Sequence, residues 1–258
     1  MSPLIYQGFT LSSSFQPIIN IRHQQVIGYE AFIRSKPPSN HQQSKANPAA
    51  LFSLATRLDQ LVLLDQLCRI SHCQSFSAQD LSGNWLFFKQ TEALARQDFS
   101  HSYLLDHLLK QSLLSPCQLI IELSEKAFKD KGLLKEVANT YKAIGLLVAL
   151  DDIELSKTTA YHIESIRPDI IKCDLRDLHR TENQHHTSHL FTKLVAVANE
   201  VGCLSVIRAV ETEKQAVLAL SSGIDLLQGN LFSLPSSSLY AGSTTLHQHI
   251  QQLQQYIL

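Results

Sequence analysis

The stretch Leu146-Leu147-Val148-Ala149-Leu150-Asp151-Asp152 decides the fold class, because an apolar run of strand length ends here in two carboxylates. Six other short apolar runs place a charged or amide side chain at or near their C-terminal ends, namely Glu30, Lys89, Glu122, Asp174, Arg208 and Gln228. A barrel of parallel strands gathers its strand ends on one face, where barrel enzymes keep their chemistry. The pattern predicts a barrel with a largely acidic mouth that also holds Lys89 and Arg208.

Strand-like and helix-like segments alternate from about residue 84 to residue 235. The strand-like segments are 85–88, 119–123, 146–150, 169–173, 204–207 and 226–228, and the helix-like ones are 103–114, 133–144, 158–166, 189–201 and 213–221. Repeated strand–helix order indicates a parallel sheet covered by helices. The strands are rich in Ile, Leu and Val without strict alternation, as is typical of strands covered on both faces. The length of 258 residues suits one eight-stranded α/β barrel.

The N-terminal part follows a different pattern. Segments 15–21 and 26–33 flank a short polar stretch and predict an antiparallel hairpin. A polar loop over 35–47 precedes Pro48, which opens a helical region that continues to about residue 76. We expect a single domain over 1–258, with the barrel at about 10–235 and a C-terminal amphipathic helix at about 243–258.

Composition excludes several classes of function. The formal net charge is −1, so no overall positive field recruits nucleic acid or an anionic membrane. The chain has five cysteines, an odd number, and none of them forms a Cys-x-x-Cys motif. These two observations argue against a disulfide framework and against a zinc knuckle. No signal peptide and no apolar run of membrane-spanning length is read, so we expect a cytoplasmic protein. Carboxylates clustered at a barrel mouth would suit Mg²⁺ or Mn²⁺, and two such ions can activate water and clamp a phosphodiester.

A set of short motifs carries a more specific resemblance. In chain order they are Phe15-Gln16-Pro17-Ile18, Gly28-Tyr29-Glu30-Ala31-Phe32-Ile33-Arg34, Leu119-Ile120-Ile121-Glu122-Leu123-Ser124-Glu125, Ala149-Leu150-Asp151-Asp152, Asp169-Ile170-Ile171-Lys172-Cys173-Asp174, Val210-Glu211-Thr212 and Gln228-Gly229-Asn230-Leu231-Phe232-Ser233-Leu234-Pro235. The ordered set, over about residues 15–235, resembles the EAL domain family of cyclic di-GMP phosphodiesterases and their degenerate relatives. The resemblance implies an α/β fold, a TIM-like (β/α)8 barrel with an antiparallel first strand.

The resemblance also implies two metal sites, and this sequence departs from both. Remnant metal ligands match at Glu30, Glu122, Asp151 and Asp152. An Asn ligand of the first metal is replaced by Lys89, and a Glu ligand of the second by Arg208. Lys172 and Glu211 match catalytic positions. The resemblance implies a glycine-containing loop after the Asp pair, but in this chain the loop reads Ile153-Glu154-Leu155-Ser156-Lys157, without glycine. Ammonium and guanidinium groups are donors only and cannot ligate a cation.

We therefore expect no metal cofactor, with Lys89 and Arg208 forming salt bridges to the acids, and no hydrolysis. We expect Mg²⁺ or Mn²⁺ as a cofactor only if the chain is an active phosphodiesterase that yields linear pGpG. The first hypothesis is a metal-independent cyclic di-GMP receptor in bacterial signalling, with biofilm and motility as outputs. The resemblance places the nucleotide against Gln16, Glu30, Phe32, Arg34, Asp152, Asp174, Gln228 and Pro235. The alternative is a nucleotide-independent module that binds a protein partner, such as a transcription or motility factor; the partner and the oligomeric state stay open.

Overall fold

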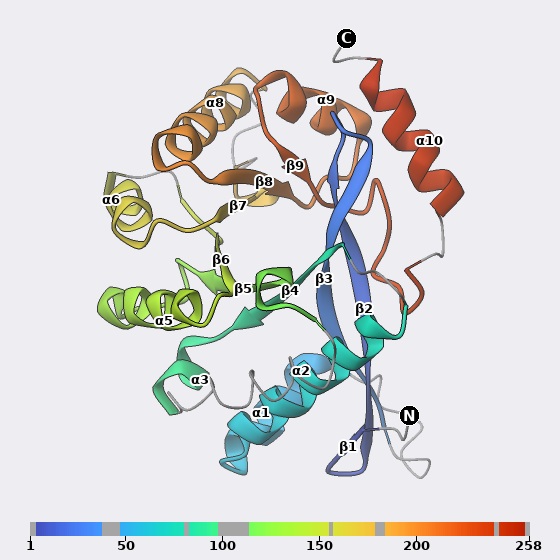
Figure 1. Cartoon of the computed structure of the whole chain (residues 1–258), viewed down its shortest axis with the longest axis vertical. Helices are drawn as coiled ribbons and strands as arrows, with labels where there is room; N and C mark the ends of the chain where they lie inside the picture. The colour runs from blue at the N-terminus through green and yellow to red at the C-terminus, as the bar shows by residue number, and fades with distance from the viewer. Residues whose placement is uncertain are drawn as a thin grey trace.

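The computed structural model describes residues 4–37, 47–79, 83–97, 114–154, 157–178, 184–239 and 243–255. Nine strands form one sheet in chain order (Figure 1). They are β1 Leu4–Tyr6, β2 Phe9–Asn20, β3 Gln25–Lys36, β4 Trp85–Gln90, β5 Leu119–Ser124, β6 Leu147–Asp151, β7 Ile170–Asp174, β8 Leu204–Arg208 and β9 Leu226–Leu227. The helices that surround them are α1 Pro48–Arg57, α2 Leu61–Ser77, α3 Glu92–Gln97, α5 Lys131–Ala143, α6 Lys157–Ile166, α7 Leu175–Leu178, α8 Gln184–Val201, α9 Glu213–Ser221 and α10 Ser243–Gln254, with a 3-10 turn at Pro116–Gln118.

Strands β2 to β9 close into an eight-stranded barrel, because β2 also pairs with β9 at Ile19 and Leu227. From β3 onward every neighbouring pair of barrel strands is parallel. Strand β2 runs antiparallel to both of its neighbours, since a short turn connects it directly to β3. The expected TIM-like barrel with an antiparallel first strand is therefore confirmed.

The inside of the barrel is built in layers. An apolar layer consists of one inward residue from each of seven strands: Ile18, Phe87, Ile120, Ala149, Ile170, Val206 and Leu226. Strand β3 contributes Gly28 at this level, where a Cβ would lie 2.9 Å from the Phe87 ring. A larger apolar cluster packs the outer faces of the strands against the helices. Because side chains of a strand alternate between its faces, the next inward positions toward the mouth form a second layer.

Several elements differ from the sequence prediction. The helical region that begins at Pro48 is two helices, because the chain turns at Asp59, whose φ is +54°. The hairpin of β2 and β3 is longer than expected, since β2 begins at Phe9 and β3 continues to Lys36. Strand β1 and helix α3 were not predicted, and α8 begins five residues before the expected start at 189. The helix expected over 103–114 lies outside the described residues except for Leu114.

Helix α10 packs against the barrel through its apolar side. Leu246, Ile250 and Leu253 are buried and join the large outer cluster. Their spacing of three and four residues is the amphipathic pattern that the sequence predicts for this segment. Among the described helices, none combines the length and the apolar character that crossing a membrane would need.

Candidate functional site

The second inward layer of the barrel carries the charged residues. Two residues beyond the apolar layer, toward the C-terminal ends of the parallel strands, each strand presents a polar or charged side chain: Glu30, Lys89, Glu122, Asp151, Lys172, Arg208 and Gln228. Antiparallel β2 reaches the same level with Gln16, two residues before its apolar position. The alternation of the strands thus explains why side chains from distant parts of the sequence meet at one level.

Lys172 lies at the centre of this layer and is fully buried. Its Nζ donates to Glu30 Oε2 at 2.9 Å and to Glu122 Oε1, and it lies 5.4 Å from the centroid of the Phe87 ring below. Burial would raise the pKa of Glu30, but the charges of Lys172 and then Lys89 outweigh it and lower that pKa to about 2. Burial, and next the charge of Glu30, raise the pKa of Glu122. Lys172 is therefore the buried counter-ion of two carboxylates that lie close together.

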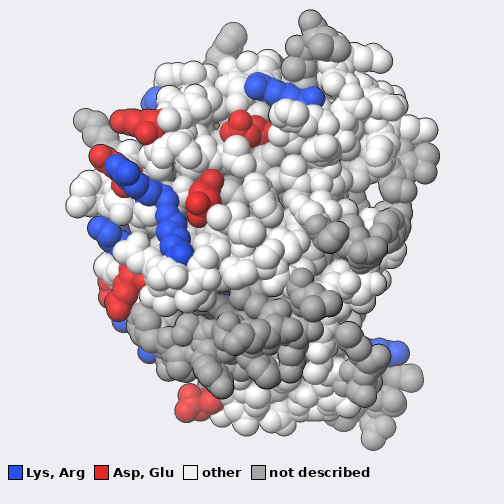
Figure 2. Space-filling model, viewed as in Figure 1, with Lys and Arg blue, Asp and Glu red and all other residues white. Residues whose placement is uncertain are grey.

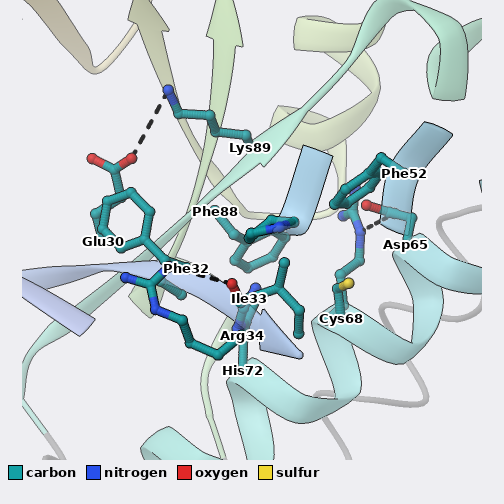
Figure 3. Close-up of a pocket in the computed structure, with 13 residues that line it drawn as sticks. Glu30, Phe32, Ile33, Arg34, Phe52, Asp65, Cys68, His72, Phe88 and Lys89 are labelled. Carbon is teal, nitrogen blue, oxygen red and sulfur yellow. Dashed lines mark hydrogen bonds and ion pairs between the residues drawn. The ribbon is translucent and has the colours of Figure 1, made fainter. Parts of the chain in front are cut away.

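Lys89 comes from β4 and extends toward Glu30 and Asp151. Its Nζ donates to Asp151 Oδ2 at 3.1 Å and lies 3.9 Å from Glu30 Oε1, as Figure 3 shows for Glu30. The side chain is 46% exposed, so water partly screens these pairs. Burial would lower the pKa of Lys89, but Glu30, Glu122 and Asp151 together raise it. The ammonium group is charged and sits between acids of two different strands.

Arg208, at the end of β8, bridges three aspartates. Its Nε lies 3.2 Å from Asp151 Oδ1, one terminal nitrogen contacts Asp152 Oδ1, and the same nitrogen lies 3.2 Å from Asp174 Oδ2. Asp152 holds a left-handed backbone conformation with φ of +53°, and its other oxygen accepts from the Ser124 hydroxyl at 2.7 Å. A non-glycine residue in this conformation is uncommon and requires support from its surroundings. The contacts to Arg208 and Ser124 provide that support.

Arg176 adds a cation that the sequence analysis missed. It follows β7 in α7 and donates from Nε and Nη2 to both oxygens of Asp174, at 3.0 and 2.6 Å. Burial would raise the pKa of Asp174, but the hydrogen bonds from Arg176 and the charge of Arg208 lower it. Only its position two residues after Asp174 could have indicated this role. The ion-paired set at the mouth therefore holds five carboxylates (Glu30, Glu122, Asp151, Asp152 and Asp174) and four cations (Lys89, Lys172, Arg176 and Arg208), a formal net charge of −1.

An open cleft lies directly above the charged layer. A network of amides forms one wall: Gln228 Nε2 donates to Glu30 Oε2 at 2.8 Å and to Gln16 Oε1 at 3.2 Å, and Gln16 Nε2 donates to Asn230 and to the Ser233 carbonyl. The cleft has a volume of about 230 Å³. Its other lining residues include Phe32, Lys89, Arg176, Arg208, Glu211 and Pro235. Polar groups from both ends of the chain therefore converge on this cleft.

A second hollow of about 340 Å³ adjoins the cleft, and the two share Glu30, Phe32 and Lys89 as lining residues. It lies between the end of β3 and helices α1 and α2 (Figure 3). Its walls are largely apolar, with Phe32, Phe52 and Phe88, and it also reaches the exposed Arg34. Its polar residues Asp65, Arg69 and His72, all on α2, were not singled out from the sequence.

The structure thus places the predicted residues unequally. Glu30, Glu122, Asp151, Asp152, Asp174, Lys172, Lys89 and Arg208 form one connected set of ion pairs. Gln16, Phe32, Gln228 and Pro235 line the cleft above it, and Arg34 lines the second hollow. Glu211 is exposed at the rim of the cleft, where its backbone N–H donates to the Gln215 side chain. Lys172 is turned into the barrel, bound to two acids.

Charged groups elsewhere on the described surface do not form a patch of one sign on the face in view. Figure 2 shows lysine and arginine side chains interspersed with aspartate and glutamate along one side of that face. The ion pairs also show such mixing: Lys126 Nζ lies 3.3 Å from Glu154 Oε1 and 3.9 Å from Asp177 Oδ2. Among the described residues of that face, the charges therefore form no continuous basic surface of the kind by which proteins usually hold nucleic acid backbones.

Comparison with known proteins places this barrel in a family. The model of the EAL domain matches residues 6–235. The chain is 24% identical over 227 residues to the probable cyclic di-GMP phosphodiesterase PdeD of Escherichia coli (strain K12), covering 85% of this chain and 40% of that protein. It is 22% identical over 231 residues to the cyclic di-GMP phosphodiesterase NbdA of Pseudomonas aeruginosa, covering 87% of this chain and 29% of that protein. The chain thus spans less than half the length of these relatives.

Solved structures show the same fold. The PaMucR phosphodiesterase in complex with c-di-GMP superposes with a TM-score of 0.76 at 20% identity, over 88% of this chain and 92% of that one. A standalone versatile EAL protein from Vibrio cholerae O395, bound to c-di-GMP, superposes with a TM-score of 0.73 at 19% identity, over 90% and 95% of the two chains. BlrP1 of Klebsiella pneumoniae, described as a manganese and cy-diGMP complex, gives 0.76 at 21% identity over 91% and 58%.

Proposed function

Because the chain belongs to the EAL domain family, we propose that it is a catalytically inactive member that binds cyclic di-GMP without a metal ion. The observation that carries this proposal is the pairing of Lys89 and Arg208 with the acids of the barrel mouth. Solved structures of BlrP1 of Klebsiella pneumoniae are described as manganese or calcium complexes with cy-diGMP. The first question is therefore whether the residues of this mouth suit such ions.

The donor set does not fit two divalent cations. Lys89 Nζ and Arg208 Nε both contact Asp151, at 3.1 and 3.2 Å, so each oxygen of this carboxylate already faces a fixed positive charge. Arg208 is positively charged at every accessible pH, and burial would lower its pKa but the three aspartates raise it further. In the part of the chain that is described, no three His, Cys, Asp or Glu side chains are grouped so as to hold a metal ion. In this proposal, no hydrolytic step runs through a metal at this mouth.

The same geometry supports the proposal that Lys172 and Glu211, at the remnant catalytic positions, have no hydrolytic role. Lys172 is a fully buried donor to two carboxylates, and a charged ammonium group cannot accept a proton. Glu211 is exposed at the rim, so water is free to solvate its carboxylate. A water molecule at this mouth would have no group present to lower its pKa as a bound divalent cation does.

Binding of a cyclic dinucleotide is supported by the two adjoining hollows. They meet at Phe32, and together they offer one compartment to each of two bases. Lys89, Arg176 and Arg208 line the cleft, and Arg34 lines the second hollow, so each compartment has a donor for a phosphate oxygen. In this proposal Gln16, Gln228, Phe32 and Pro235 contact the ligand, while Glu30, Asp152 and Asp174 orient the cations.

Calorimetry with cyclic di-GMP in EDTA tests the proposal, together with a phosphodiesterase assay in Mg²⁺ and in Mn²⁺. We expect saturable binding in EDTA, an affinity that added metal leaves unchanged, and no turnover to linear pGpG. Turnover above background with either metal would refute the claim of inactivity. Arg22→Gln is the matched control for substitution of Arg176 or Arg208, the two arginines that line the cleft. Arg22 is exposed in the β2–β3 turn and lines neither hollow.

One observation favours a second candidate function, a nucleotide-independent protein-interaction module. The mouth has a net charge of −1, and every one of its cations is already paired with a carboxylate. A ligand that carries two phosphate charges must therefore compete with internal carboxylates for each cation. Absence of heat with cyclic di-GMP, both in EDTA and in Mn²⁺, would favour this module. In either case we propose a cytoplasmic signalling role exerted through a protein partner.

A further inference from the structure

The four cations of the barrel mouth differ in how firmly the fold holds them. Among the described ion pairs, Lys172 is the only cation paired with Glu122, and Arg208 is the only one paired with Asp152. Glu122 is buried, and removing the counter-ion of a buried carboxylate is strongly destabilising. Arg208 also supports the left-handed backbone conformation of Asp152. Lys172 and Arg208 therefore have to stay in place when a ligand binds.

Lys89 shares each of its carboxylates with another cation. Asp151 Oδ1 also lies 3.2 Å from Arg208 Nε, and Glu30 Oε2 also accepts from Lys172 Nζ at 2.9 Å. Neither carboxylate would lose its last cation if the ammonium group of Lys89 moved away. The side chain of Lys89 is half-exposed and lines the cleft, so it can reach a ligand that binds there.

Arg176 shares Asp174 with Arg208 in the same way. Both oxygens of Asp174 accept from the guanidinium of Arg176, and Arg208 Nη2 lies 3.2 Å from Asp174 Oδ2. The backbone N–H of Arg176 also donates to Asp174 Oδ1 at 2.8 Å, independently of the guanidinium. Asp174 would therefore keep a cation and a hydrogen bond if the guanidinium group of Arg176 turned away. The side chain of Arg176 is 70% exposed and lines the same cleft.

We propose that Lys89 and Arg176 release their carboxylates and bind the phosphate groups of the ligand, whereas Lys172 and Arg208 stay in place as counter-ions of the mouth. This role rests on the proposed binding of cyclic di-GMP and names the two side chains that exchange partners. Each exchange replaces a charge-assisted hydrogen bond to a carboxylate with one to a phosphate oxygen. Because no carboxylate loses its last cation, the competition between the ligand and the internal acids costs least at these two residues.

The order of the ion pairs also fits a ligand with two phosphates. From Lys89 the contacts run to Asp151, then to Arg208, then to Asp174 and finally to Arg176. The two releasable cations are thus the end members of this row, and Arg208 in its middle stays paired with aspartates. Two cations at the ends of one row match a ligand that carries two separate phosphate groups.

Calorimetry on the full chain in EDTA tests this exchange with two ligands, cyclic di-GMP and GpG, the linear dinucleotide without a terminal phosphate. GpG has the same two guanine bases but a single phosphate group, so it can engage only one of the two cations. We expect the wild type to bind cyclic di-GMP at least about tenfold more tightly than GpG. Equal affinity of the wild type for the two ligands would overturn the inference, and this measurement needs no variant.

The double variant Lys89→Met with Arg176→Gln removes both releasable cations. Its affinity for cyclic di-GMP should fall by about a hundredfold, because two contacts are lost, and its affinity for GpG by about tenfold. A merely structural role would weaken the binding of both ligands by the same factor. Equal losses for the two ligands, or no loss, would therefore refute the exchange. If the double variant does not fold, the single variant Arg176→Gln, at an exposed side chain, still has to weaken cyclic di-GMP binding by about tenfold.

Lys126→Met and Arg96→Gln are the matched controls. Lys126 is 48% exposed and pairs with Glu154, and Arg96 is 52% exposed and pairs with Glu92, but neither lines the cleft. Both controls should keep the affinity for each ligand within about twofold. Loss of affinity in the controls equal to that in the double variant would overturn the assignment to Lys89 and Arg176. Failure of the wild-type chain to bind cyclic di-GMP would instead refute the proposed function, and the inference with it.

Discussion

Replacing both Lys89 by Asn and Arg208 by Glu is expected to turn the barrel mouth into a site for divalent cations. The change removes two positive charges and adds one negative charge, so the net charge of the mouth goes from −1 to −4. It also supplies two oxygen donors beside Asp151, the carboxylate that both cations contact. Oxygen donors and a surplus of negative charge are what Mg²⁺ and Mn²⁺ require.

The expected size of the effect follows from the position of Arg208. Its Nε lies 3.2 Å from Asp151 Oδ1, so a divalent ion bound to the other oxygen of Asp151 would lie at about 5.5 Å from the guanidinium. At an effective dielectric constant of about 20, this repulsion is about 6 kcal/mol. A penalty of this size lowers metal affinity by about four powers of ten. Because Arg208 is sufficient to impose this penalty even without Lys89, the single variant Lys89→Asn is expected to leave metal binding undetectable.

Thermal unfolding in EDTA and in a series of Mn²⁺ concentrations measures the effect. A metal at 100 times its dissociation constant adds about 2.7 kcal/mol to the free energy of unfolding. For a chain of this size, that raises Tm by roughly 5–10 °C. We expect this rise in the double variant and no rise in the wild type or in Lys89→Asn. An equal rise in the wild type, or none in the double variant, would refute the reasoning that fixed cations exclude the metals.

Three further predictions concern stability. Lys172→Met removes the buried counter-ion that Glu30 and Glu122 share, so the free energy of unfolding measured in urea should fall by about 3–5 kcal/mol. The control Lys126→Met, at an exposed pair, should change it by no more than about 0.5 kcal/mol. Gly229→Ala would place a Cβ 2.0 Å from a backbone oxygen and should lower Tm and weaken ligand binding, whereas Gly83→Ala, with nothing within 4 Å, should do neither. The lowered pKa of Glu30 means that its ionised form stabilises the fold above about pH 4.5 and that this contribution is lost as the pH falls toward 2. Glu30→Gln should therefore flatten the acid limb of the stability curve, and an unchanged limb would contradict the assignment.

The barrel and its charged mouth were predictable because their signal is local. Each strand is an apolar run that ends in a polar residue, and two-residue alternation then places that residue one layer above the core. The hairpin of β2 and β3 was equally visible, since a short polar turn permits only antiparallel pairing. The break at Asp59 was not visible, because apolar residues keep their helical spacing across it and only a left-handed backbone conformation marks the turn.

The ion-pair partners within the mouth could not be predicted from the sequence. From the sequence, Lys89 and Arg208 had four candidate carboxylates, and Asp174 was expected only as a ligand contact. In the folded chain, Asp174 pairs with both Arg208 and Arg176, and Glu122 pairs with Lys172. Which acid meets which base depends on the stagger of strands around a closed barrel, which no stretch of sequence encodes alone.

The sequence by itself determined the kind of molecule, because strand and helix order and the family motifs are written in residue types and spacing. It also places Lys89 and Arg208 at two positions where the family resemblance implies metal ligands. The tertiary structure alone decided how the mouth is neutralised and where a second, aromatic-walled hollow lies, with buried Arg69 at its edge. The physical reason is that burial and charge pairing are properties of three-dimensional proximity. Residues such as Asp65 and Gln90 become partners of Arg69 only when α2 is packed against β4.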